Sequence, residues 1–127
     1  MALASVPIAR PQTVGTPIAV RLIGILDRPL IESFANASAG VLIGGPRTLI
    51  VNVGDAHAMH DESFRRFVAV LESYRAAGHD IRLTLNAAWR KLMREHRAFF
   101  SEVDADVQRA TRRQLIIAQT TERRAGK

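Results

Sequence analysis

The chain has 127 residues and contains no cysteine. This length suits one domain with its own hydrophobic core, and the lack of cysteine excludes a disulfide scaffold and a thiolate metal site. No apolar run reaches the length of a membrane span, and the N-terminus lacks the layout of a signal peptide. We therefore expect a soluble cytoplasmic protein that does not insert into the membrane.

The formal net charge of +6 makes nucleic acid a partner to consider. The basic residues gather in one predicted helix and near the C-terminus, but acids are interspersed among them and no aromatic residues alternate with the C-terminal arginines. A solvated basic face explains this pattern better than a nucleic-acid interface does. The alternative is that the chain binds nucleic acid through the basic tail and a helix with Arg90, Lys91, Arg94 and Arg97. This alternative predicts an affinity that falls steeply as the salt concentration rises.

Residues 1–16 contain two prolines and a glycine, which predicts an N-terminal arm with at most a short edge strand at 6–9. Residues 18–25 are mostly apolar and predict the first strand. Asp27 then caps a helix that has Pro29 in its first turn and that stops at Gly44-Gly45-Pro46. The apolar stripe of this helix consists of Leu30, Ile31, Phe34, Ala37 or Ser38, Val41 and Leu42.

The stretch 49–53 is apolar almost throughout and predicts a strand that is buried on both faces. A surface loop that holds several acids follows it and opens into a helix that ends at Gly78. The apolar face of that helix is formed by Phe64, Phe67, Val68, Leu71 and Tyr74. Asp61 and Glu62 fall at its N-terminus, where the macrodipole stabilises each negative charge by roughly 0.3–1 kcal/mol. That stabilisation explains the two acids without any function.

Residues 80–85 alternate and predict a strand with one wet face. Asn86 caps the next helix, whose apolar side includes a partly buried His96, and His79 is predicted to act as a cation at the end of the preceding helix. A short strand is predicted within 98–103. Asp104 or Asp106 then starts a terminal helix through Val107, Ala110, Leu115 and Ala118, followed by a disordered basic tail at 119–127.

Strands and helices therefore alternate along the chain. This order predicts an α/β domain with a mixed, mainly parallel sheet of four to five strands and about four helices packed against it. The domain is expected to span residues 17–118.

No catalytic pattern accompanies this fold. The glycines form no phosphate loop, and His57, His60 and Asp61 lack a fourth metal ligand. Ser63 has His60 and Asp61 as neighbours in sequence but no nucleophile elbow around it. We expect a protein that is not an enzyme and that holds no metal and no cofactor.

The ordered set of segments resembles the STAS domain, the family of sulfate-transporter and anti-sigma-factor-antagonist modules. The resemblance covers roughly residues 17–118 and rests on intervals between segments rather than on one specific motif. Its marks are Gly24-Ile25-Leu26-Asp27, the 49–53 strand with Asp55 and Met59, the helix that closes with Gly78-His79, the 81–85 strand, and the segment 89–99.

In that family the loop before the second helix usually reads Asp-Ser-Ser-Gly, and its first serine is phosphorylated by a partner kinase. An ungapped match anchored at Asp55 and Gly78 places Asp61 at the phosphorylated position, and a shift by one residue places Glu62 there and Ser63 at the second serine. Both registers put a carboxylate where the phosphate would be attached. Ser63 remains a position for phosphorylation in the shifted register.

The resemblance implies a protein-binding module that acts as an anti-sigma factor antagonist and whose partner is an anti-sigma factor or a GHKL-type kinase. We expect docking through the loop and helix start, with Asp55, His57, His60, Asp61, Glu62, Ser63, Arg65 and Arg66 as contact residues. A solvated helix face is an equally simple explanation for each charged residue taken alone.

The alternative function is an accessory STAS subunit on the ATPase of an ABC-type membrane transporter. In either function, Asp61 and Glu62 have two possible effects: they hold the protein in a phosphorylated-like state, or they bind a basic surface of the partner. The sequence leaves both outcomes open. It also leaves open the identity of the partner and the oligomeric state.

Overall fold

The structure is a computed structural model that describes residues 16–58, 60–111 and 113–118. Strands and helices alternate from end to end, as predicted. The elements are β1 (Ile18–Ile25), α1 (Arg28–Val41), β2 (Thr48–His57), α2 (Asp61–Ala76), β3 (Asp80–Thr84), α3 (Ala87–Glu95), β4 (Ser101–Glu102), α4 (Ala105–Ala110) and β5 (Arg113–Ala118). The predicted edge strand at 6–9, the tail at 119–127 and Met59 lie outside the described residues.

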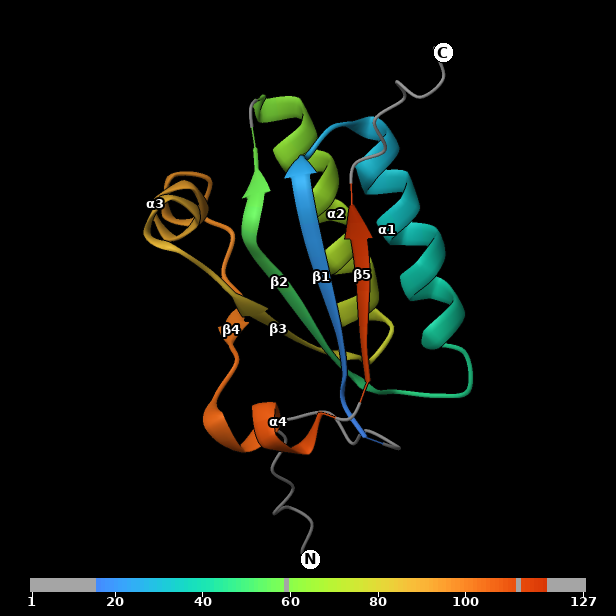
Figure 1. Ribbon diagram of the computed structural model, residues 1–127. Helices are drawn as coiled ribbons and strands as arrows, with labels where there is room; N and C mark the ends of the chain where they lie inside the picture. The colour runs from blue at the N-terminus through green and yellow to red at the C-terminus, as the bar shows by residue number, and fades with distance from the viewer. Residues whose placement is uncertain (1–15, 59, 112, 119–127) are drawn as a thin grey trace, which may run out of the picture.

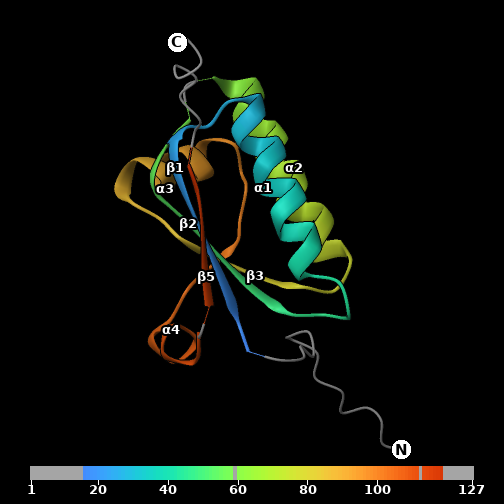
Figure 2. The same ribbon diagram turned by 45° about the vertical axis from the view of Figure 1, so that its right-hand side comes forward.

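The sheet has five strands in the order β4-β3-β2-β1-β5, and every pair is parallel (Figure 1). The predicted α/β fold with a mainly parallel sheet is therefore confirmed. Helices α1 and α2 lie together on one side of the sheet, α3 lies beside the ends of β2 and β3, and α4 lies at the opposite end (Figures 1 and 2). No described helix crosses the centre of the other face.

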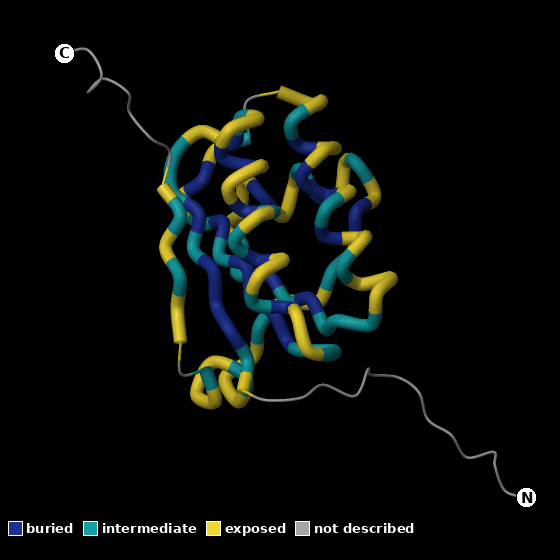
Figure 3. The backbone as a smooth tube through the Cα atoms, turned by 90° about the vertical axis from the view of Figure 1, so that its right-hand side faces the viewer, coloured by how far each residue is buried: buried dark blue, intermediate teal, exposed yellow. Residues whose placement is uncertain are grey.

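The core lies between the sheet and the pair α1 and α2. Phe34 of α1 and Phe67 of α2 are fully buried, and their ring centroids are 5.4 Å apart. Buried residues follow the strands and the inner sides of the helices, whereas residues on the outer turns are exposed (Figure 3). Each large apolar side chain that is removed from water contributes about 1.5–3 kcal/mol, so this layer accounts for most of the hydrophobic stabilisation.

Three of the four helices in the described part of the chain begin with the predicted Asp or Asn cap. In each, the side-chain oxygen of the cap accepts a hydrogen bond from the backbone N–H three residues later, at 2.9–3.0 Å. The hydrogen bond from the Val107 N–H is also the main reason why the pKa of Asp104 is lowered. These caps are Asp27 for α1, Asn86 for α3 and Asp104 for α4.

Helix α2 ends as predicted. Ala77 is its C-cap, and the next residue, Gly78, has φ +102°, in the left-handed region that glycine adopts without strain. The Gly78 N–H donates to the Arg75 carbonyl at 3.0 Å. The chain thereby turns directly from α2 into β3.

The predicted terminal helix through Ala118 is wrong beyond Ala110. Residues 113–118 form β5, which pairs with β1 in the register Val20↔Leu115 and Leu22↔Ile117. The side chains of Leu115 and Ile117 pack against the core, whereas Ile116 points the other way and is 60% exposed. Pairing with the free edge of β1 thus outweighs the weak helical spacing of this segment.

The prediction of a buried strand at 49–53 is confirmed, because Leu49 and Val51 on one face and Ile50 on the other are each at most 2% exposed, and only Asn52 is half-buried. One further prediction needs correction. His79 does not act as a cation at the end of α2: its Nδ1 accepts a hydrogen bond from the Arg47 N–H at 3.1 Å, and burial lowers its pKa. A ring nitrogen that accepts a hydrogen bond must be unprotonated, so the neutral form is the one that fits here.

Candidate functional site

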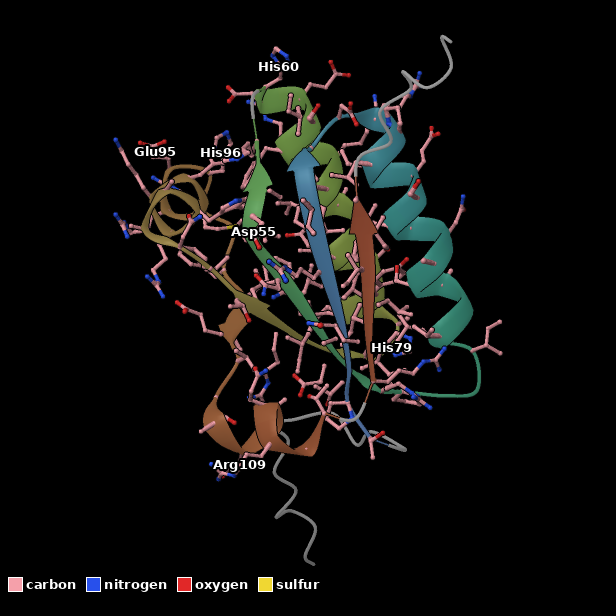
Figure 4. All side chains as sticks on the ribbon, in the orientation of Figure 1. Asp55, His60, His79, Glu95, His96 and Arg109 are labelled. Atoms are coloured by element: carbon pink, nitrogen blue, oxygen red, sulfur yellow. The ribbon has the colours of Figure 1, made fainter. Side chains whose placement is uncertain are left out.

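The candidate site lies where β2 passes into α2, at the carboxyl ends of the parallel strands. Open α/β sheets bind their ligands outside this edge. In Figure 4, His60 marks this end of the molecule and Arg109 of α4 marks the opposite end. The predicted loop is shorter than expected, because β2 continues to His57 instead of ending after Val53.

The two acids at the start of α2 are on the surface. The side chain of Asp61 is 70% exposed and that of Glu62 is 80% exposed. Glu62 Oε2 accepts a hydrogen bond from Arg66 Nη2 at 3.0 Å, one turn along the helix, and Asp61 Oδ1 lies 3.6 Å from His96 Nε2. Exposed pairs of this kind contribute about 0–1 kcal/mol, so both carboxylates stay accessible to a partner.

Helix α2 starts without a side-chain cap. His60 has an extended backbone (φ −133°, ψ 142°) and occupies the cap position, but its side chain makes no capping hydrogen bond. The first intrahelical bond runs from the Phe64 N–H to the His60 carbonyl at 3.0 Å. Stabilisation of this helix end therefore comes from the charges of Asp61 and Glu62 rather than from a capping oxygen.

Asp55 does not join this cluster. A bulge in the pairing of β1 and β2 lies between the pairs Arg21↔Asn52 and Ile23↔Asp55. Regular alternation from Val53 would turn Asp55 toward the core, and the extra residue turns it to the open face instead. There Arg21 Nε donates to Asp55 Oδ2 at 2.9 Å, and Arg21 Nη2 contacts the same oxygen. Figure 4 shows Asp55 along the sheet, away from His60.

His57 is exposed and opens toward α3. It lines a groove of about 390 Å³ between the end of β2 and α3, together with Trp89 and Lys91. The Trp89 indole N–H donates to the Ala56 carbonyl at 2.9 Å, which holds α3 against the strand. His57 therefore belongs to the groove beside α3, and among the described residues no hydrogen bond links it to the start of α2.

The remaining predicted residues lie along the first turns of α2. Ser63 is half-buried, so its hydroxyl is less accessible than the carboxylates before it. Arg65 is exposed and makes no ion pair with the described residues, whereas Arg66 is held by Glu62. Arg65 also borders a groove of about 260 Å³ between α2 and the segment after α3. The structure thus brings together His60, Asp61, Glu62, Ser63, Arg65 and Arg66.

Sequence analysis did not anticipate that His96 contacts the site. Its ring packs at a tilt of 49° against Phe64, with centroids 4.6 Å apart, and its Nε2 lies 3.6 Å from Asp61 Oδ1. The apolar spacing of α3 predicted only that His96 would be partly buried. A separate signal in the sequence is Arg21, a charged residue inside an apolar strand, which favours an ion pair, and its partner in the structure is Asp55.

Comparisons of the chain with protein-family models, with curated proteins and with solved structures found no match. The resemblance to STAS domains therefore stays a prediction. Among residues 16–58, 60–111 and 113–118, no three His, Asp or Glu side chains are grouped so that they could hold a metal ion. No helix in the same ranges is long and apolar enough to cross a membrane.

Proposed function

We propose that this chain is a non-catalytic, STAS-like protein-binding module that docks a regulatory partner at the start of α2. The observation that carries the proposal is that Asp61 and Glu62 are the first two residues of this helix and are both exposed. We propose further that the partner is an anti-sigma factor or a GHKL-type kinase and that the protein acts in the cytoplasm.

Fixed negative charge at this place has a physical consequence. A phosphoserine at a helix N-terminus adds about −1.5 to −2 charges and three acceptor oxygens. Asp61 and Glu62 supply two negative charges without a modifying enzyme, and carboxylates form strong hydrogen bonds with arginine and lysine. A partner with a basic surface would gain both attraction and orientation from them.

The test starts with affinity capture of the full chain from its own cells and identification of the bound protein. The affinity of that purified partner is then measured for Glu62→Lys. Loss of a charge pair at the interface predicts a decrease of at least about tenfold, equivalent to about 1.4 kcal/mol.

Asp106→Lys is a matched control. Asp106 is also an exposed acid in the first turn of a helix, and it pairs with Arg109 much as Glu62 pairs with Arg66. It lies in α4, at the other end of the molecule (Figure 1). Unchanged affinity for Glu62→Lys, or an equal loss for both variants, would contradict docking at α2. Capture of a transporter ATPase instead of a sigma-factor regulator would favour the alternative function, an accessory subunit of an ABC-type membrane transporter.

A further inference from the structure

A second surface of opposite charge lies at the edge of the sheet formed by α3, β4 and the segment between them. We call it the α3 edge, and it surrounds a groove of about 200 Å³. Pockets that enclose drug-sized ligands measure about 300–1,000 Å³, so this groove is too small for a typical cofactor. Its lining consists of Leu83, Leu85, Arg90, Met93, Arg94, Ala98, Phe99, Phe100 and Glu102.

The rim of the groove exposes a large aromatic side chain. Phe99 is 68% exposed, although Ala98 beside it is buried. The segment is held in place by Arg75 of α2, whose Nη1 donates to the Phe99 carbonyl at 2.7 Å and whose guanidinium lies 4.1 Å from the centre of the Phe100 ring. The backbone that carries the exposed Phe99 ring is thus fixed by Arg75. An aromatic side chain on a fixed backbone loses little conformational entropy when it binds a partner.

The charges at this edge are mainly positive. Arg90 is held by Glu102 through two hydrogen bonds of 3.1 Å, which also lower the pKa of Glu102. Arg94 is exposed and makes no ion pair with the residues that the structure describes. Lys91 and Arg97 also have no ion-pair partner in the described ranges, but they line the neighbouring grooves beside His57 and Arg65.

We propose that the α3 edge docks an acidic segment of a partner protein, with an apolar side chain of that segment in the groove beside Phe99 and its carboxylates at Arg94. Complementary charge supports this occupant, since Arg94, which has no ion-pair partner among the described residues, borders an apolar floor. The proposal is independent of the function proposed for α2, where the charges have the opposite sign. The α3 edge and the start of α2 would then select different partners.

A nucleic acid is the less suitable occupant. Glu102 lies in the groove and Glu95 lies on α3, so phosphates along this edge would meet carboxylates as well as cations. Single-stranded nucleic acids also bind to several aromatic side chains in succession, whereas Phe99 is the large aromatic residue exposed among those described.

The experiment uses the full chain and a library of random twelve-residue peptides displayed on phage. We expect selection of peptides with two or more acids next to a large apolar residue. The selected peptides are then measured against Arg94→Glu and Phe99→Ser, each of which should weaken binding by at least about tenfold. Both side chains are exposed, so thermal unfolding of the variants should match that of the original chain.

Lys91→Glu is the matched control, because it reverses a charge on the same helix but lines the other groove, next to His57. It should weaken peptide binding by about twofold or less, through the long-range field alone. No enrichment of acidic peptides, or an equal effect of Lys91→Glu and Arg94→Glu, would overturn the proposal. Tighter binding of a single-stranded oligonucleotide than of the peptides would overturn the proposal too. So would a dimer of the chain, detected by light scattering, that Arg94→Glu or Phe99→Ser dissociates.

Discussion

At the scale of single residues, His79 shows how a tertiary contact sets a charge state. Its Nδ1 accepts a hydrogen bond from the backbone N–H of Arg47, and its ring packs edge-on against Tyr74. Burial lowers the pKa of His79 from its usual value of 6.5. The folded chain therefore favours neutral His79, whereas the unfolded chain protonates it at a higher pH.

This difference predicts a pH-dependent stability. Because the pKa of His79 is lower in the folded state, the contribution of neutral His79 is fully present above 6.5 and is lost as the pH falls below that value. The free energy of unfolding should fall less between about pH 7.5 and about pH 5 for His79→Gln than for the original chain. Glutamine keeps an acceptor for Arg47 and does not titrate.

The measurement is urea unfolding of both chains at each pH. The difference between the chains isolates His79 from the other histidines, His57, His60 and His96. Parallel pH profiles of the two chains would show that the charge state of His79 does not matter for folding.

At the scale of elements, β5 is the segment in which local pattern and tertiary structure disagree. Leu115 and Ala118 are three residues apart and share a face in a helix, which favoured the helical interpretation. In the strand, Leu115 and Ile117 share the inner face instead, and Ile116 faces outward. The free edge of β1 offers backbone hydrogen bonds that a short helix cannot match.

Two identical substitutions on neighbouring residues test this assignment. Ile117→Ala should lower the free energy of unfolding by about 1–2 kcal/mol, less than for a fully buried isoleucine, because Ile117 is only half-buried. Ile116→Ala should change it by less than about 0.5 kcal/mol, since that side chain is 60% exposed. Chemical denaturation measures both values, and a larger loss at Ile116 would contradict the inward direction of Ile117.

At the scale of the whole molecule, the charges divide between two places. Exposed acids mark the start of α2, and Arg94, without an ion-pair partner among the described residues, marks the α3 edge. The chain as a whole carries a net charge of +6. Each place makes its own contacts, and no hydrogen bond or ion pair links Glu62 to Arg94 among the described residues. The two surfaces should therefore act separately.

Separate action predicts that the two charge reversals have reciprocal effects. Glu62→Lys should reduce binding of the α2 partner and change binding of the acidic peptide by about twofold or less, and Arg94→Glu should do the opposite. In the double variant the free-energy changes should add within about 0.5 kcal/mol. Titration calorimetry with each ligand measures these values, and strong non-additivity would indicate one shared surface.

Most of the framework was predictable because it depends on local chemistry. The caps Asp27 and Asn86, the stop at Gly78 and the apolar faces of α1 and α2 all follow from neighbours within a few residues. The exposed position of Asp61 and Glu62 follows as well, since both precede the apolar stripe of α2. Such features are encoded by spacing along the chain, whatever the rest of the molecule does.

The sequence by itself thus determined the α/β alternation and the acidic start of α2. Only the tertiary structure decided that residues 113–118 join the sheet, that a bulge turns Asp55 toward Arg21, and that His96 faces Asp61. The physical reason is that each of these features joins two residues that are far apart in the sequence, from 34 positions for Arg21 and Asp55 to almost 100 for β1 and β5. The stability of each contact depends on the strand edge or charged group that the fold places opposite the residue. The spacing of residues along the chain does not specify that partner.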